Sequence, residues 1–181
     1  MSINTATPPS LLPAQHKLIK KKQRTRLASQ KSKTGQTAII FVASKSVELA
    51  TLNESDWNDY VRALDLFNRK YFWECHEVLE DVWMMHQPPL KTFLQGIIQS
   101  AAAFYHVLGE NPRGAIKLAS DARSKLKNFA PHYLGLNLDL LIQELQFFED
   151  ESNEILTLKK TQFTLDRIPT LSIPQKAHEM S

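Results

Sequence analysis

The segment between Lys91 and Glu110 places the strongest constraint on the fold, because it contains no charged residue. Wound as an α-helix, it presents apolar side chains around almost its whole circumference. Such a helix is stable only where other parts of the protein cover it on every side. A membrane span is the poorer interpretation, because the segment contains Gln95, Gln99, Ser100 and His106. We therefore expect a buried central helix over residues 90–108.

Helical patterns on both sides of this segment supply the elements that would cover it. We predict helices over residues 55–69, 72–85, 90–108, 112–129 and 138–148. Ser55 or Asp56 can cap the first helix, and Asn111 can cap the fourth, with a proline at its first position. Pro88-Pro89 ends the second helix. No segment shows sustained strand alternation, so the sequence predicts an all-α fold, a bundle of about five helices with short turns.

Composition and cysteine count restrict the class of protein further. With 181 residues, of which 43% are hydrophobic and 23% charged, the chain fits one globular domain with tails. The single cysteine, Cys75, excludes an intramolecular disulfide and any zinc site built from several cysteines. Gly-rich phosphate loops and dinucleotide fingerprints do not occur in the sequence. We divide the chain into an N-terminal tail (1–50), a helical domain (51–150) and an extended C-terminal tail (151–181).

The positive charge of the chain is concentrated in the N-terminal tail. Residues 1–47 contain nine of the 22 basic residues and no Asp or Glu. Residues 48–181 contain the other 13 basic residues and all 19 acidic residues, which gives them a net charge of −6. The tail also lacks an apolar helical stripe, and a segment of this composition cannot bury enough surface to fold. The sequence therefore predicts a disordered basic tail on a mildly acidic domain.

The role of this tail has more than one interpretation from the sequence. A basic leader with Ser and Thr and without acidic residues is typical of an organelle transit peptide, which would direct the protein to a plastid. A solvated extension of a bacterial protein is the alternative, and the protein would then be cytoplasmic. The start lacks the pattern of a secretion signal, so we do not expect a secreted protein. No aromatic residue interleaves Lys20–Arg26, which argues against nucleic-acid binding.

Several chemically distinctive side chains gather on one side of the predicted helix 72–85. At 100° per residue, an arc of about 120° holds Trp73, His76, Glu77, Glu80 and Trp83. His76 and Glu80 lie one turn apart at the edge of the buried face. On the central helix, an arc of about 60° holds Gln95, Gln99 and His106.

This arrangement predicts a site for a divalent metal. A histidine and a carboxylate one turn apart, facing a second histidine, can hold zinc, iron or manganese and leave a position for water. We predict His76, Glu80 and His106 as metal ligands. Glu77 would be a further ligand or the general base. The supporting residues around them would be Trp83, Gln95 and Gln99.

Two other interpretations of the same region stay open. The histidine, glutamates and glutamines can form an internal hydrogen-bond network that fixes helix packing without any ligand. Alternatively, the turn after the central helix can bind a small anion, because the start of the next helix offers N–H groups and the positive end of its dipole. Asn111 and Arg113 would contact this anion.

Several motifs occur together along residues 60–130. They are Phe67-Asn68, Phe72, His76-Glu77-x-Leu79-Glu80-x-x-Trp83, Leu94-Gln95-Gly96-Ile97-Ile98-Gln99, His106 and Asn111-x-x-Gly114-Ala115. In this combination they resemble the domain of unknown function 309 family, a small all-helical domain of bacteria and plastids that is often labelled a metal-dependent hydrolase. The resemblance points to a site at His76, Glu77, Glu80 and His106. Lys70 is a departure, because the family usually has a glycine before its second helix.

Two functions from different classes follow. One is a metal-dependent hydrolase in which Glu77 activates water. The other is a non-catalytic helical module that binds a small anion or a protein partner, or forms a homodimer through exposed apolar helix faces. In the second case the polar residues would fix packing rather than catalyse a reaction. Metal content separates the two.

Overall fold

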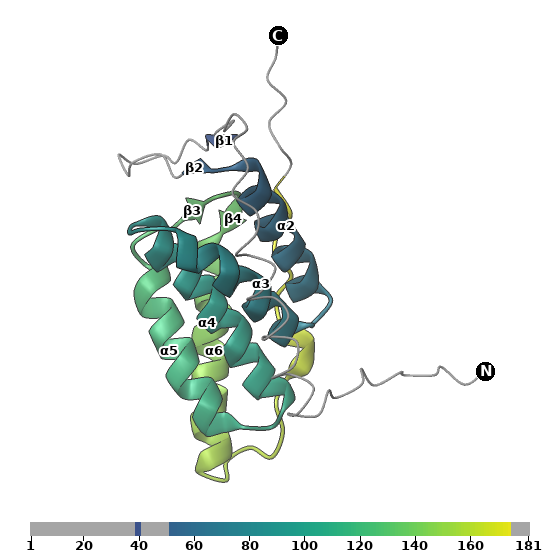
Figure 1. The fold of residues 1–181 in the computed structure, drawn as a ribbon. Helices are drawn as coiled ribbons and strands as arrows, with labels where there is room; N and C mark the ends of the chain where they lie inside the picture. The colour runs from purple at the N-terminus through teal and green to yellow at the C-terminus, as the bar shows by residue number, and fades with distance from the viewer. Residues whose placement is uncertain (1–38, 41–50, 175–181) are drawn as a thin grey trace, which may run out of the picture. The chain divides into compact units, whose positions relative to one another are not determined.

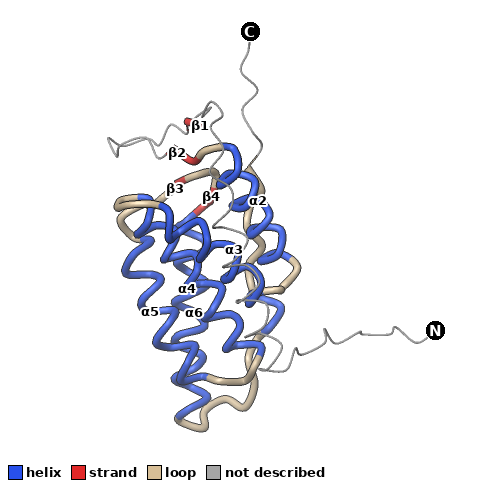
Figure 2. Tube along the Cα trace, in the orientation of Figure 1, coloured by secondary structure: helices blue, strands red, loops and turns tan. Residues whose placement is uncertain are grey.

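Five α-helices make up most of the chain that the computed structural model describes, residues 39–40 and 51–174 (Figure 1). The helices are α2 (Glu54–Asn68), α3 (Phe72–Met85), α4 (Leu90–Leu108), α5 (Pro112–Leu126) and α6 (Leu138–Leu156). Short antiparallel ladders pair β1 (Ile39–Ile40) with β2 (Thr51–Leu52) and β3 (His132–Tyr133) with β4 (Leu136–Asn137). A 3-10 turn, η1 (Leu165–Arg167), follows α6. Figure 2 shows how little strand this part of the chain contains, and the predicted all-α fold is confirmed.

The central helix of the bundle is α4, which packs between α3 and α5 and also contacts α6 (Figure 1). The fully buried ring of Phe104 packs against rings of α2, α3 and α6, at centroid distances of 5.6, 5.7 and 5.5 Å for Phe67, Phe72 and Phe148. Gly96 allows α5 to approach closely, because a Cβ there would lie 2.7 Å from Leu126 Cδ2. The charge-free segment is therefore the buried central helix that its sequence predicts.

Asparagine side chains cap α2, α5 and α6. Asn111 Oδ1 accepts a hydrogen bond from the Gly114 N–H at 3.1 Å, so the predicted cap of α5 is confirmed. For α2 the prediction of Ser55 or Asp56 is wrong. The cap is Asn53, whose Oδ1 accepts from the Asp56 N–H at 2.9 Å. Asp56 lies in the first turn instead, where an acidic side chain suits the positive end of the helix dipole.

The C-terminal part of the chain differs most from the prediction. We expected the last helix to end at Phe148 and an extended tail to follow, but α6 continues to Leu156. A strap, defined as residues 157–174, then returns along the bundle and carries η1 (Figure 1). Asn68 of α2 holds this strap, because its side chain makes two hydrogen bonds, of 2.6 and 2.8 Å, with the backbone of Leu171.

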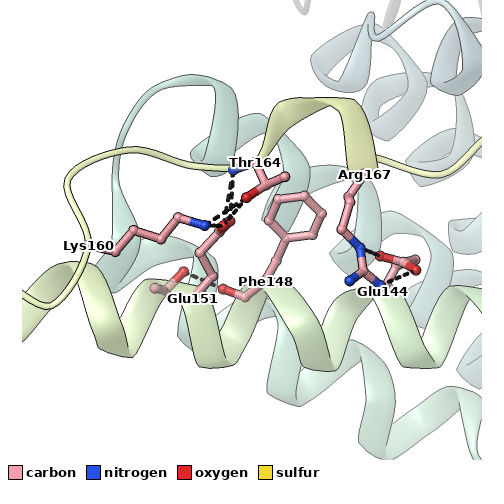
Figure 3. A network of polar contacts seen from close by, with 7 residues as sticks. Glu144, Phe148, Glu151, Lys160, Thr164 and Arg167 are labelled. Atoms are coloured by element: carbon pink, nitrogen blue, oxygen red, sulfur yellow. Dashed lines mark hydrogen bonds and ion pairs between the residues drawn. The ribbon is translucent and has the colours of Figure 1, made fainter.

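Glu151 provides the physical reason for the longer helix. Its side chain is buried, with 3% of its surface exposed, although it belongs to an acidic stretch that we interpreted as the start of a tail. The carboxylate accepts hydrogen bonds from the backbone N–H and hydroxyl of Thr164 and from Lys160 Nζ (Figure 3). These donors come from the strap, so the hydrogen bonds tie the strap to the last turns of α6.

The remaining expectations concern the ends of the chain and membranes. The predicted disordered tail lies outside the described residues except for Ile39–Ile40, and its role as a transit peptide or a bacterial extension stays a prediction. None of the described helices has the length and apolar character that crossing a membrane requires.

Candidate metal centre

Three side chains of α3 bring candidate metal ligands together. One ring nitrogen of His76 and one carboxylate oxygen from each of Glu77 and Glu80 lie within 4.8 Å of one another. His76 and Glu80 share a face of the helix because they are four residues apart, and Glu77 reaches the same point from the adjoining face. All three side chains are half-buried. The cluster contains three of the four residues that we expected around a metal.

An aromatic ring fixes the imidazole of His76. Trp73, one turn earlier on α3, stacks on it with ring centroids 5.5 Å apart and 14° between the ring planes. Tyr105 of α4 packs against this indole, with ring centroids 5.6 Å apart. We did not predict either ring as part of the site. The spacing of three residues between Trp73 and His76 is the sequence signal that could have identified the first of them.

Carboxylates make this face of the bundle electronegative. The pKa of Asp81 is raised, first by burial and then by the negative charges of Glu80, Asp59 and Glu77. Asp59 belongs to α2, so two helices contribute to the negative potential. Asp81 itself is half-buried. Like charges held this close favour a cation beside them.

The structure does not bring His106 into the cluster of described ligand residues. Its Nδ1 lies 3.1 Å from Asn111 Nδ2, in the turn between α4 and α5. Its ring also packs against the start of α5, where a Cβ on Gly114 would come within 2.7 Å of it. The glycine in the Asn111-x-x-Gly114 motif thus makes room for the imidazole, and His106 anchors this turn.

Of the two residues expected to bind an anion, Asn111 makes its hydrogen bonds within the same turn. Asn111 Oδ1 accepts the Gly114 N–H, which is one of the groups that an anion would use. Asn111 Nδ2 faces His106, and Arg113 is exposed. An anion at this position would have to displace the cap of α5.

The supporting residues and the cysteine have distinct surroundings. Lys91 Nζ lies 4.5 Å from the centroid of the Trp83 ring, a cation–π contact between α3 and α4. Gln95 and Gln99 are half-buried on α4, and the buried Gln99 Oε1 has no hydrogen-bond partner among the described residues. Cys75 is fully buried, and burial raises the pKa of its thiol to about 12, so it belongs to the core.

Comparisons with known proteins agree with the resemblance stated above. Residues 60–118 match the family model described as "Domain of unknown function (DUF309)", a range that includes all of α3 and α4. The chain is 33% identical over 94 residues to "Uncharacterized protein YpuF" of Bacillus subtilis (strain 168), a match that covers 50% of this chain and 53% of that protein. The chain thus spans about half the length of this curated relative. No solved structure matches. The resemblance to the family is confirmed.

Proposed function

We propose that this domain, similar to the domain of unknown function 309 family, binds one divalent cation through His76, Glu77 and Glu80 and uses it for hydrolysis. The observation that carries the proposal is the convergence of their three ligand atoms within 4.8 Å on α3. The stacked Trp73 and the neighbouring carboxylates add support, because they orient the imidazole and provide a negative potential for the cation.

The donor set fits zinc, iron or manganese. It combines one imidazole nitrogen with two carboxylate oxygens, a set that suits these metals and whose two negative charges balance a divalent cation. Ligand bonds of about 2.0–2.2 Å would bring any two ligand atoms to within about 4.4 Å of each other. The three atoms already lie within 4.8 Å of one another, and the half-buried glutamate side chains can make the remaining adjustment by a change of rotamer.

The three residues of the cluster would have different roles in hydrolysis. A bound divalent cation would supply Lewis-acid polarisation of a substrate and a lowered pKa for water. His76 and Glu80 would hold it, one turn apart on the same face of α3. Glu77 would bind it through one carboxylate oxygen, and its other oxygen would accept the proton from the attacking water.

Metal content of the full chain, purified without an affinity tag, tests the proposal. We expect stoichiometric zinc, iron or manganese by mass spectrometry, and its loss in His76→Ala and in Glu80→Ala. The matched control is Glu74→Ala, which removes an exposed glutamate of the same helix and should leave the metal in place. Wild-type protein that carries no metal, and takes up none when it is added, would refute the site.

Hydrolysis needs its own test once metal binding is established. We expect the metal-loaded protein to cleave members of a panel of chromogenic carboxylic and phosphoric esters. Glu77→Gln should lower the rate at least tenfold while the folded protein persists, because it removes the base but keeps the shape of the side chain. Equal rates for Glu77→Gln and the wild type would contradict the role of Glu77.

A non-catalytic role is the second candidate, and the interlocked turn at His106 favours it. His106, Asn111 and Gly114 pack together in a way that holds α4 and α5 in place without a ligand. If the polar residues of α3 act similarly, His76→Ala should lower the free energy of unfolding by about 1–3 kcal/mol, and the wild type should contain no metal. Urea unfolding together with metal analysis decides between the two functions.

A further inference from the structure

One buried side-chain oxygen of α4, Gln99 Oε1, has surroundings that set it apart from the other polar atoms of this helix. Gln99 Oε1 is buried, and no described residue donates a hydrogen bond to it. Buried acceptors in native proteins almost always have a partner, so an amide oxygen in this condition calls for a ligand, an ion or a water. Gln99 lies on the half-buried side of α4, in the range that matches the family model.

The register of the two helices places Gln99 opposite the cluster. α3 and α4 follow each other through a short turn and pack together. Lys91 contacts Trp83 near the turn, and Tyr105 contacts Trp73 at the far end. Because the helices run in opposite directions, higher residue numbers on α4 lie opposite lower residue numbers on α3 between these two contacts. Gln99 therefore lies across from the turn of α3 that carries His76 and Glu77.

We infer that Gln99 Oε1 is a further ligand of the cation held by His76, Glu77 and Glu80, so that the cation links α3 to α4. This inference rests on the function proposed above. A carboxamide oxygen is a suitable ligand for a hard divalent cation such as manganese. A carboxamide is neutral, so it adds a ligand and no further negative charge. The two glutamate carboxylates already balance the charge of a divalent cation. It also accounts for a buried acceptor that has no hydrogen-bond partner among the described residues.

Calorimetric titration of the metal-stripped full chain with manganese chloride tests the inference. Gln99→Leu replaces the amide with an apolar side chain of similar size and so removes the oxygen. This substitution should raise the Kd for manganese at least tenfold. Gln99→Glu restores an oxygen at the same place and should bind manganese within about threefold of the wild type or more tightly. Gln143→Leu is the matched control, because it replaces an exposed glutamine of α6, and it should leave the Kd unchanged.

Thermal unfolding with and without manganese provides a second readout that needs no activity. The metal-induced rise in Tm should be smaller in Gln99→Leu than in the wild type, because the stabilisation by a ligand decreases as its Kd increases. Manganese binding by the wild type with the same Kd in Gln99→Leu would overturn the inference and leave the proposed function intact. Equal weakening in Gln99→Leu and Gln99→Glu would also overturn it, because the amide would then act as a donor. No divalent cation bound by the wild type would overturn both.

Discussion

Replacing Glu151 tests whether the C-terminal strap belongs to the folded domain. Glu151→Ala removes the acceptor for three donors, the Thr164 N–H at 3.1 Å, the Thr164 hydroxyl and Lys160 Nζ (Figure 3). Hydrogen bonds to a charged group stabilise a protein by about 1.5–3 kcal/mol each. Lys160 has 35% of its side chain exposed and can turn to water, so its loss should contribute little. We expect the two bonds to Thr164 to dominate and the free energy of unfolding to fall by about 2–4 kcal/mol.

The pH dependence of this effect provides a sharper check. Burial alone would raise the pKa of Glu151, but the hydrogen bonds from Lys160 and Thr164 outweigh it, and the pKa lies below the usual 4.5. A carboxyl group with a lowered pKa stabilises the fold above its unfolded-state pKa, and this contribution is lost as the pH falls through the folded-state pKa. Glu151→Gln, which cannot ionise, should therefore be less stable than the wild type at pH 7. The difference should shrink below about pH 4.

Urea unfolding followed by circular dichroism, at neutral and at acid pH, measures both effects. Glu154→Ala is the matched control, because it removes an exposed glutamate of the same helix and should change the free energy of unfolding by less than about 0.5 kcal/mol. A Glu151→Ala protein as stable as this control would refute the reasoning. A deficit of Glu151→Gln that stays constant with pH would refute the contribution of the charge.

Three further changes test other contacts. Gly114→Ala would place a Cβ 2.7 Å from the His106 ring and should lower the free energy of unfolding in urea by about 1–3 kcal/mol, whereas Gly109→Ala, with its nearest atom at 3.4 Å, should not. Lys70 has a φ of 63°, a left-handed conformation that glycine adopts more easily, so Lys70→Gly should raise the same free energy by roughly 0.5–1 kcal/mol; a decrease would contradict this. Burial raises the pKa of Cys75 to about 12, so a thiol reagent at pH 8 should modify it only as fast as the protein unfolds, and rapid modification of the native protein would contradict its burial.

The helices that could be predicted are those whose signals lie in neighbouring residues. The charge-free run set the position of α4, and the observed bounds of α3 and α4 agree with the prediction. The end of α6 could not be predicted in this way. Its last turns depend on Glu151, whose donors Lys160 and Thr164 come later in the chain. The periodicity of a single helix does not indicate such contacts with another segment.

The candidate site was predictable only as far as one helix defines it. His76, Glu77 and Glu80 meet because their spacing on α3 brings them together. His106 shares an arc of α4 with Gln99, but it lies seven residues further along the axis, which is about 10 Å. A projection down the helix axis hides this distance, so angle alone placed His106 with the cluster. Its actual contacts, Asn111 and the start of α5, depend on a turn that the projection does not represent.

Glu151 and Asp81 make the stability of this fold depend on pH in opposite directions. This contrast distinguishes a structural carboxylate from one beside the candidate site. The pKa of Glu151 is lowered by matched donors, so its stabilisation is lost in acid. The pKa of Asp81 is raised, first by burial and then by repulsion from the charges of Glu80, Asp59 and Glu77. The ionised side chain therefore weakens the fold at neutral pH, and this effect is relieved as the pH falls through the raised pKa. Carboxylates that serve only packing acquire donors, whereas carboxylates that repel one another beside a histidine are typical of a site. A divalent cation would relieve the same repulsion, and protons would compete with it, so its stabilising effect should be greater at neutral than at acid pH.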